Sequence, residues 1–95
     1  MRWKLEEFGT RCDAIGLHRK WLVLREDGCG YMVAWANFSP SMGVPRHRSM
    51  ECMAFPYAAG AVTSWVDVAC VYGRKATESL AIVLGQLGIE LEGEL

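Results

Sequence analysis

The sequence lacks the short motifs by which many metal sites, redox proteins and nucleotide-binding enzymes are recognised. It has no Cys-x-x-Cys pair and no closely spaced pair of histidines, which argues against a sequence-local zinc knuckle or dithiol redox site. The only glycine-rich stretch, residues 28–31, lacks the lysine and the following helix that a phosphate loop requires. We therefore expect no cofactor, no bound metal and no enzymatic activity.

Long apolar runs and a strong charge of one sign are also missing. No run approaches the ~20 residues needed to cross a bilayer, and charges interrupt residues 1–13 too often for a signal peptide. The net charge is −1, which is unlike the clustered cationic field of most nucleic-acid-binding proteins. With 52% apolar residues in 95, the chain suits one packed domain over residues 1–95, soluble and cytoplasmic, without membrane contact.

Cysteines are present, but their spacing indicates no site. Each lies in an apolar stretch, where a reduced thiol packs like a small core residue. A disulfide or a metal site assembled in three dimensions is the alternative, with Cys52 and Cys70 as the pair to watch. A cysteine nucleophile would need His18 or His47 as its base and an orienting carboxylate, and nothing in the spacing favours that arrangement. The four cysteines are Cys12, Cys29, Cys52 and Cys70.

Alternating apolar residues predict an antiparallel sheet. Residues 19–27 form a β-branched and aromatic run that ends at Asp27-Gly28, a dipeptide typical of hairpins. Residues 29–38 follow as the second strand of that hairpin. Within it, the side chains alternate between two faces, with Tyr31, Val33 and Trp35 on one and Met32, Ala34 and Ala36 on the other.

The flanking strands are less regular. Upstream we expect strands near residues 2–8 and 10–15. Downstream, residues 50–55 predict a strand that stops at Pro56, followed by a turn at residues 58–60. Residues 62–72 alternate well and predict one further strand, which completes a second hairpin.

The chain ends in a predicted helix. Apolar residues recur at three- and four-residue steps, Thr77 and Glu78 suit its start, and Gly88 followed by Ile89 suits a left-handed ending. Gly85 inside the helix suggests close packing on the sheet. The fold class is therefore α+β, a single antiparallel β-sheet of about 4–6 strands packed against one C-terminal α-helix. The helical positions are Ala76, Leu80, Val83, Leu84 and Leu87.

The second half of the chain carries a resemblance. Residues 51–56 (ECMAFP) and 60–65 (GAVTSW) give an E-x-M-x-F-P strand, a turn and a V-T-x-W strand. This pattern resembles small uncharacterised proteins encoded by bacteriophages and prophages, over about residues 50–90. Cys52 departs from it, since a small or β-branched residue is expected there. The resemblance implies a mobile-element origin and a compact α+β fold, and it transfers no catalytic residue.

One segment concentrates positive charge. Residues 39–48 contain two prolines and the group Arg46-His47-Arg48, so they predict a semi-rigid loop. Two interpretations are open. The segment is either a solvated connection or a tip that recognises anions, on acidic protein or phosphate, with Arg19, Lys20, Arg74 and Lys75 nearby.

From these features we expect a non-enzymatic phage or mobile-element accessory protein in the cytoplasm of a bacterial host. It would bind and block a host macromolecular complex, as an anti-CRISPR or other anti-defence inhibitor does. One alternative is a nucleic-acid-binding module that uses the cationic loop and exposed aromatics as a stacking platform. Another is a structural homodimer built through edge strands or an open sheet face. The predicted partner-binding residues are Arg46, His47, Arg48, Arg19, Lys20, Trp35 and Tyr31.

Overall fold

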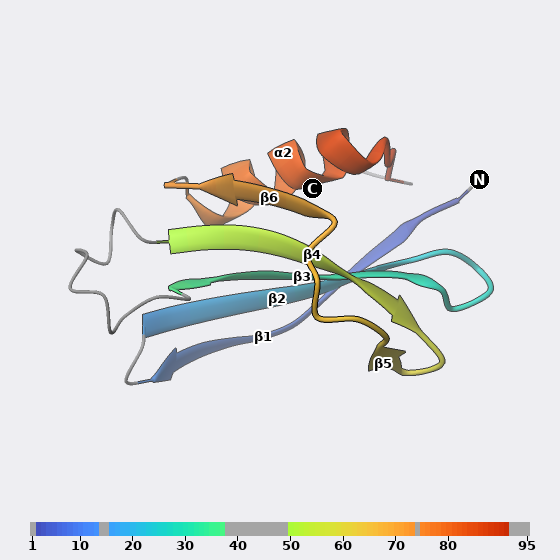
Figure 1. Cartoon of the computed structure of the whole chain (residues 1–95), viewed down its shortest axis with the longest axis horizontal. Coiled ribbons are helices and arrows are strands. Elements are labelled where there is room, and N and C mark those ends of the chain that lie inside the picture. Colours follow the sequence, from blue (N-terminus) through green and yellow to red (C-terminus); the bar gives the residue numbers. More distant parts are fainter. Residues whose placement is uncertain (1, 14–15, 38–49, 74, 92–95) are drawn as a thin grey trace.

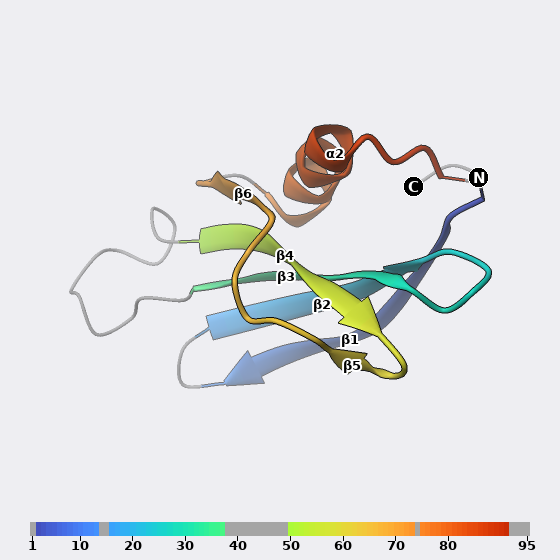
Figure 2. The same ribbon diagram turned by 45° about the vertical axis from the view of Figure 1, so that its right-hand side comes forward.

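The computed structural model describes residues 2–13, 16–37, 50–73 and 75–91, with the backbone alone for residues 8–13, 16–18 and 37. It contains a sheet in the order β1-β2-β3-β4-β5, in which β6 also pairs with β4, and all of these pairings are antiparallel. The helix α2 packs on one face, against β6, β4 and β3 (Figures 1 and 2). The predicted α+β class is confirmed. The elements are β1 (Lys4–Asp13), β2 (Gly16–Leu24), β3 (Gly30–Asn37), β4 (Met50–Ala58), β5 (Ala61–Val62), β6 (Ala69–Tyr72) and α2 (Ala76–Leu87).

The hairpin of β2 and β3 forms at the predicted turn. Gly28 has a φ of 83°, the left-handed region that glycine enters without steric cost. The Asp27 carboxylate accepts a hydrogen bond from the backbone N–H of Cys29 at 2.9 Å, which fixes the turn. The predicted alternation in β3 is also confirmed, because Val33 packs in the cluster beneath α2 and Met32 packs in the cluster on the opposite face.

The boundaries predicted for the first strands were wrong. Residues 4–13 form one strand with a register shift between Glu7 and Thr10, and Asp13 pairs with Gly16 at the start of β2. A bulge, which adds residues to one strand without ending it, therefore takes the place of the break that we expected between strands 2–8 and 10–15. The cationic segment at residues 39–48 lies outside the described residues.

The strand predicted over residues 62–72 is also divided. Tyr57 pairs with Val62 in β5, whereas Ala54 pairs with Ala69 in β6, so the intervening residues 63–68 leave the ladder. The strand β4, in contrast, continues through Pro56 to Ala58 instead of stopping. The Pro56 carbonyl accepts a hydrogen bond from the N–H of Thr63, so the backbone polar groups of Pro56 face this segment. Because proline has no N–H, it cannot donate a hydrogen bond on this edge of β4. Pro56 thus fits the ladder between β4 and β3 and interrupts the ladder on the opposite edge of β4.

The helix α2 covers the main core. The buried cluster beneath it joins Trp21 and Val23 of β2, Val33 of β3 and Cys52 of β4 to the apolar stripe of the helix. The predicted helical positions are confirmed, and Ile89 donates its N–H to the Leu84 carbonyl around Gly88, whose φ is 70°. The buried stripe of α2 consists of Ala76, Ser79, Leu80, Val83 and Leu84.

Gly85 does not pack on the sheet. It is exposed, and a Cβ built on it would meet nothing within 4 Å. The helix start also differs from expectation, since α2 begins at Ala76 and Lys75 precedes it without a side-chain capping bond. Thr77 is therefore inside the first turn and caps nothing.

Candidate interaction surface

Residues 63–68, which we call the arch, form a short excursion from the edge of β4. The N–H of Thr63 donates to the Pro56 carbonyl at 2.9 Å, and the N–H of Val68 donates to the Ala54 carbonyl at 2.9 Å. Within the arch, the Ser64 hydroxyl accepts a bond from the N–H of Val66 at 3.3 Å. Hydrogen bonds thus hold the arch at both ends, although it lies outside regular secondary structure.

The arch exposes large apolar side chains. Trp65 and Val66 are each 71% exposed, and Val68 is 50% exposed. The Trp65 ring meets Phe55 edge to face, with centroids 5.2 Å apart and an interplanar angle of 61°. Phe55 is buried in the sheet, so it supports one side of the indole while the remainder faces solvent. Trp65 is therefore an exposed aromatic side chain supported by a buried one.

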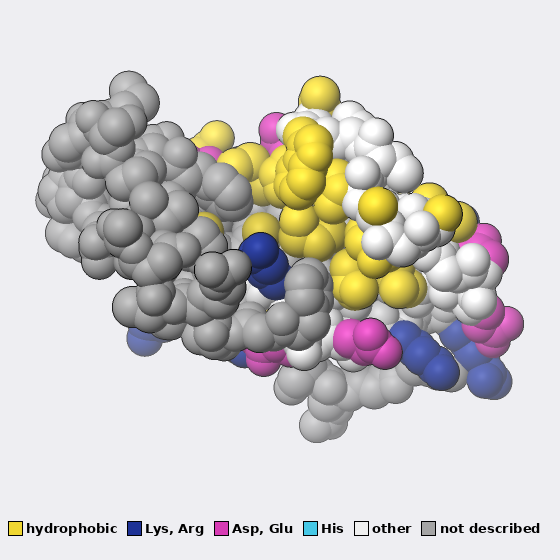
Figure 3. All heavy atoms as spheres, turned by 90° about the horizontal axis from the view of Figure 1, so that it is seen from below, with side chains coloured by type: hydrophobic (Ala, Val, Ile, Leu, Met, Phe, Trp, Pro, Cys, Tyr) yellow, Lys and Arg dark blue, Asp and Glu magenta, His cyan; other side chains and the backbone are white. Residues whose placement is uncertain are grey.

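The sheet face on this side of the molecule is apolar as well. Met32, Ala34 and Phe55 form its buried cluster, and Met53, Tyr57 and Val62 pack around them. Figure 3 shows hydrophobic side chains gathered at the middle of the face seen from below, with charged side chains along the lower right border and a Lys or Arg side chain beside the hydrophobic ones. We call this side of the sheet the open face, because α2 packs on the other one.

Acidic and aromatic side chains border the arch where it enters β6. Glu51 of β4 is the register partner of Tyr72 of β6, and Tyr72 is 64% exposed. Burial, with the charge of Asp67 as a second cause, raises the pKa of Glu51. A hydrogen bond to the Cys70 side chain, followed by nearby negative charges, raises the pKa of Tyr72 to about 12. The charge of Asp67, within the arch, therefore acts on Glu51 at its border.

The predicted partner-binding residues are divided between the two sheet faces. Arg19 and Trp35 are register partners on the α2 side, and Tyr31 lies further along the same face. Lys20 pairs with Ala34, which belongs to the opposite cluster, so Lys20 points to the open face. The structure thus brings Arg19 and Trp35 together and separates Lys20 from them. Arg46, His47 and Arg48 lie outside the described residues.

Arg19 is already engaged within the fold. Its guanidinium donates two hydrogen bonds to the Glu7 carboxylate, at 2.6 and 2.9 Å, and lies 5.1 Å from the centre of the Trp21 ring. The hydrogen bond to Glu7 is the main cause that raises the pKa of Arg19, and its counterpart lowers the pKa of Glu7. Tyr31 likewise stacks on Trp3, with centroids 6.1 Å apart. These contacts give both residues a structural role.

Cys52 and Cys70 do not form a pair. Cys52 faces the core beneath α2, whereas Cys70 is the register partner of Met53, which packs on the open face. Successive side chains of a strand point to opposite faces, so the two sulfurs lie on different sides of the sheet. Cys29, Cys52 and Cys70 are free thiols, and burial raises the pKa of Cys52 to about 12. The buried thiol is held in its neutral, unreactive form.

No metal centre emerges from the described residues. They contain no group of three or more His, Cys, Asp or Glu side chains that could hold an ion. The cysteine and histidine arrangement considered from the sequence depends on the side chains of His18 and His47, which lie outside the described part of the chain.

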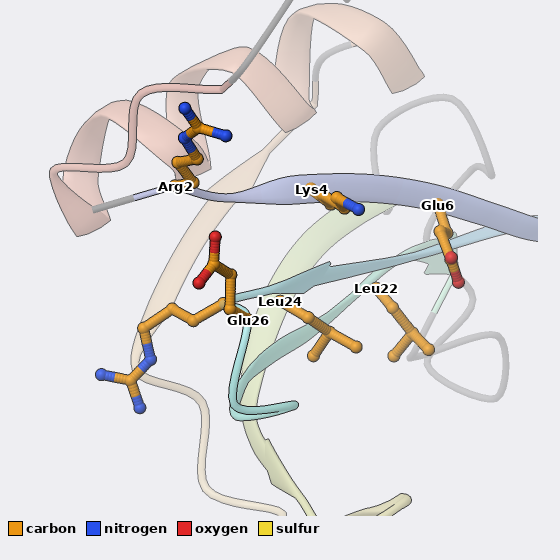
Figure 4. Close-up of a pocket in the computed structure, with 7 residues that line it drawn as sticks. Arg2, Lys4, Glu6, Leu22, Leu24 and Glu26 are labelled. Atoms are coloured by element: carbon orange, nitrogen blue, oxygen red, sulfur yellow. The ribbon is translucent and has the colours of Figure 1, made fainter.

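A shallow pocket opens between the start of β1 and the end of β2, with a volume of about 260 Å³. Figure 4 shows Leu22 and Leu24 on its floor and the Glu26 carboxylate directed toward Arg2. Its cations alternate with carboxylates, so it offers a ligand no field of one sign. The lining consists of Arg2, Lys4, Glu6, Leu22, Leu24, Arg25 and Glu26.

With this geometry established, the chain was compared with protein-family models, curated proteins and solved structures, and none of them matched. In the part of the chain that the structure describes, no helix combines the length and the apolar character needed to span a membrane. The fold and the surface together define a small α+β domain, one sheet with a helix on one face and an exposed apolar arch beside the other.

Sequence reasoning missed most of this surface. The strand predicted over residues 62–72 contains the surface's exposed side chains Trp65, Val66, Asp67, Val68 and Tyr72. The signal that could have found them is Pro56, because a proline in a paired strand removes one N–H from the ladder. The charge of Asp67 between two valines is a second signal.

Proposed function

We propose that this chain is a non-catalytic binding protein whose arch recognises another protein. The observation that carries the proposal is the exposure of Trp65, Val66 and Val68 on a segment held at both ends by backbone hydrogen bonds. Large apolar side chains that are exposed together on a small domain mark an interaction site. Tryptophan is also one of the residues that contribute most to the binding energy of protein interfaces. A fixed arch loses little conformational freedom on binding, which favours affinity.

The apolar gain expected at Trp65 is that of a hot-spot residue. Covering the exposed part of Trp65 would contribute roughly 3 kcal/mol at ~25 cal/mol per Å². Val66 and Val68 would add apolar area to the same contact. The contribution of Trp65 alone exceeds the ~2 kcal/mol that defines a hot-spot residue.

The acidic border supports a protein partner over nucleic acid. Glu51 and Asp67 lie beside the exposed aromatics and would repel phosphate. Arg19, a predicted phosphate contact, is instead bound to Glu7. The nucleic-acid interpretation therefore depends on Lys20, on the open face, and on Arg46, His47 and Arg48, which lie outside the described residues.

The resemblance to phage and prophage proteins supplies the biological context of the proposal. A small protein of mobile-element origin that binds through an apolar surface would act by occluding a host or phage complex, as anti-defence inhibitors do. In that setting the partner is a bacterial macromolecular complex, and the protein works in the host cytoplasm. A homodimer through the same surface is the competing assembly.

The test is capture of partners from bacterial lysate by the tagged protein, with and without nuclease, followed by mass spectrometry and stoichiometry in the purified complex. We expect a stoichiometric protein complex that resists nuclease, that the Trp65→Ala variant loses and that the Thr77→Ala variant, changed on the exposed side of α2, retains. Loss of the complex only in the Arg46→Ala/Arg48→Ala variant would move the site to the cationic segment.

Two further results would overturn the proposal. Capture abolished by nuclease would indicate a nucleic-acid-binding module. A concentration-dependent dimer in sedimentation, dissociated by Trp65→Ala, would indicate that the arch closes a homodimer instead.

A further inference from the structure

Resting on the proposed function, we infer that the arch surface takes a partner segment in which an arginine is flanked by apolar residues. The arginine would lie against the Glu51 and Asp67 carboxylates, and its apolar neighbours would cover Trp65 and Val66.

The first support is unbalanced charge. Glu51 is half-buried, and Asp67 lies near enough to act on it electrostatically. Among the described residues, neither carboxylate has a cationic partner. Two carboxylates that act on each other, one of them partly removed from water, favour a cation beside them. A cationic segment would therefore gain attraction and relieve repulsion at one place.

The second support is the apolar and aromatic surface around this pair. Tyr72 is the register partner of Glu51 and is 64% exposed, so its ring is accessible beside the carboxylate. Val66 and Val68 flank Asp67 in sequence and are exposed as well. A partner that carried only positive charge would leave this apolar surface in water, so both characters are needed.

Arginine suits the site better than lysine. Its planar guanidinium presents several N–H donors in a fixed fork, which can serve two carboxylates at once, and its face stacks on aromatic rings. A lysine ammonium is a compact, strongly hydrated charge that gains less from a neighbouring ring. The combination of carboxylates and an exposed tyrosine therefore favours a guanidinium.

The experiment uses a library of short random-sequence peptides, selected on the full chain and on two variants. We expect wild-type binders to be enriched in arginine next to Leu, Ile, Val or Phe. Replacing that arginine by glutamine should weaken binding to the wild type roughly tenfold. The Glu51→Gln/Asp67→Asn variant should bind the two peptides with affinities within about twofold of each other, because it has lost the charge and kept the shape.

The variants separate the two ideas. If Trp65→Ala abolishes binding of every selected peptide, the arch is the interface, as proposed above. If peptides bind through Trp65 but carry no arginine preference, or if the preference survives in Glu51→Gln/Asp67→Asn, the inference about the partner fails and the proposed function stands. Peptides that are bound equally by Trp65→Ala, or no bound peptides at all, would count against both.

Discussion

At the scale of single residues, Ser79 is the exception in an otherwise apolar stripe. It is 1% exposed beneath α2, and its hydroxyl has no hydrogen-bond partner within the described part of the chain. A buried hydroxyl without a partner loses its hydration and gains nothing in return, which costs about 1–3 kcal/mol. The residue therefore weakens the helix-to-sheet contact.

We predict that Ser79→Ala raises the free energy of unfolding by about 1 kcal/mol, because alanine removes the unpaired hydroxyl and fits the same space. Urea denaturation would measure the change. The Thr77→Ala variant, at an exposed position of the same helix, is the control for helix propensity alone. Equal or smaller stabilisation by Ser79→Ala than by Thr77→Ala would contradict the prediction.

Gly85 gives a second residue-scale prediction. Because nothing lies within 4 Å of a Cβ at this position, Gly85→Ala should stabilise the protein by about 0.5–1 kcal/mol through helix propensity. Gly88 is the matched control, since its φ of 70° makes Gly88→Ala destabilising by roughly 1 kcal/mol. Thermal melts of both variants would check the pair, and a loss of stability in Gly85→Ala would mean that the position is packed.

At the scale of elements, β6 pairs with β4 alone among the described residues, and α2 covers part of its other edge with one side chain. The Gln86 amide accepts a hydrogen bond from the backbone N–H of Cys70 and donates one to its carbonyl, both at 3.2 Å. An unpaired strand edge is a template for pairing with another chain. The glutamine imitates a neighbouring strand at one residue and so occupies part of that edge.

We predict that Gln86→Ala speeds hydrogen exchange at the Cys70 amide and lowers the free energy of unfolding by about 1 kcal/mol. Exchange followed by NMR would measure the first effect, and urea denaturation the second. Gln86→Glu is the control that keeps an acceptor for the Cys70 N–H and loses the donor. Unchanged exchange in Gln86→Ala would show that the clamp is absent in solution.

At the scale of the whole molecule, the fold depends on α2 as the cover of the main core. Leu84 is buried between the helix and the sheet, whereas Ala81 faces solvent on the same helix. A charge at Leu84 would be placed in an apolar cluster without a partner. For a domain whose total stability is about 5–10 kcal/mol, that change is severe.

We predict that Leu84→Asp lowers the free energy of unfolding by roughly 4 kcal/mol or more. The variant should no longer be folded at room temperature and should show no cooperative transition on heating. Ala81→Asp should leave the transition within about 1 kcal/mol of the wild type. Circular dichroism melts of the two variants would measure both. A cooperative, stable Leu84→Asp protein would mean that α2 does not close this core.

The elements that the sequence predicted well depend on local patterns. The Asp27-Gly28 turn, the two-faced alternation of β3 and the apolar spacing of α2 each require only neighbouring residues and were confirmed. The first strands were missed because the bulge between Glu7 and Thr10 depends on the register with β2, which no local pattern encodes. The arch was missed for a related reason, since its residues alternate like a strand.

The sequence by itself determined the fold class, the hairpin turn and the buried stripe of the helix, because periodicity and turn chemistry are properties of adjacent residues. Only the tertiary structure decided which face α2 covers, that Cys52 and Cys70 lie on opposite sides, and that Trp65 is exposed. These outcomes depend on register, where a shift of one residue exchanges the two faces of a strand. Pro56 illustrates both contributions. The sequence alone shows that this residue has no N–H, whereas the pairing of the strands decides which ladder it interrupts.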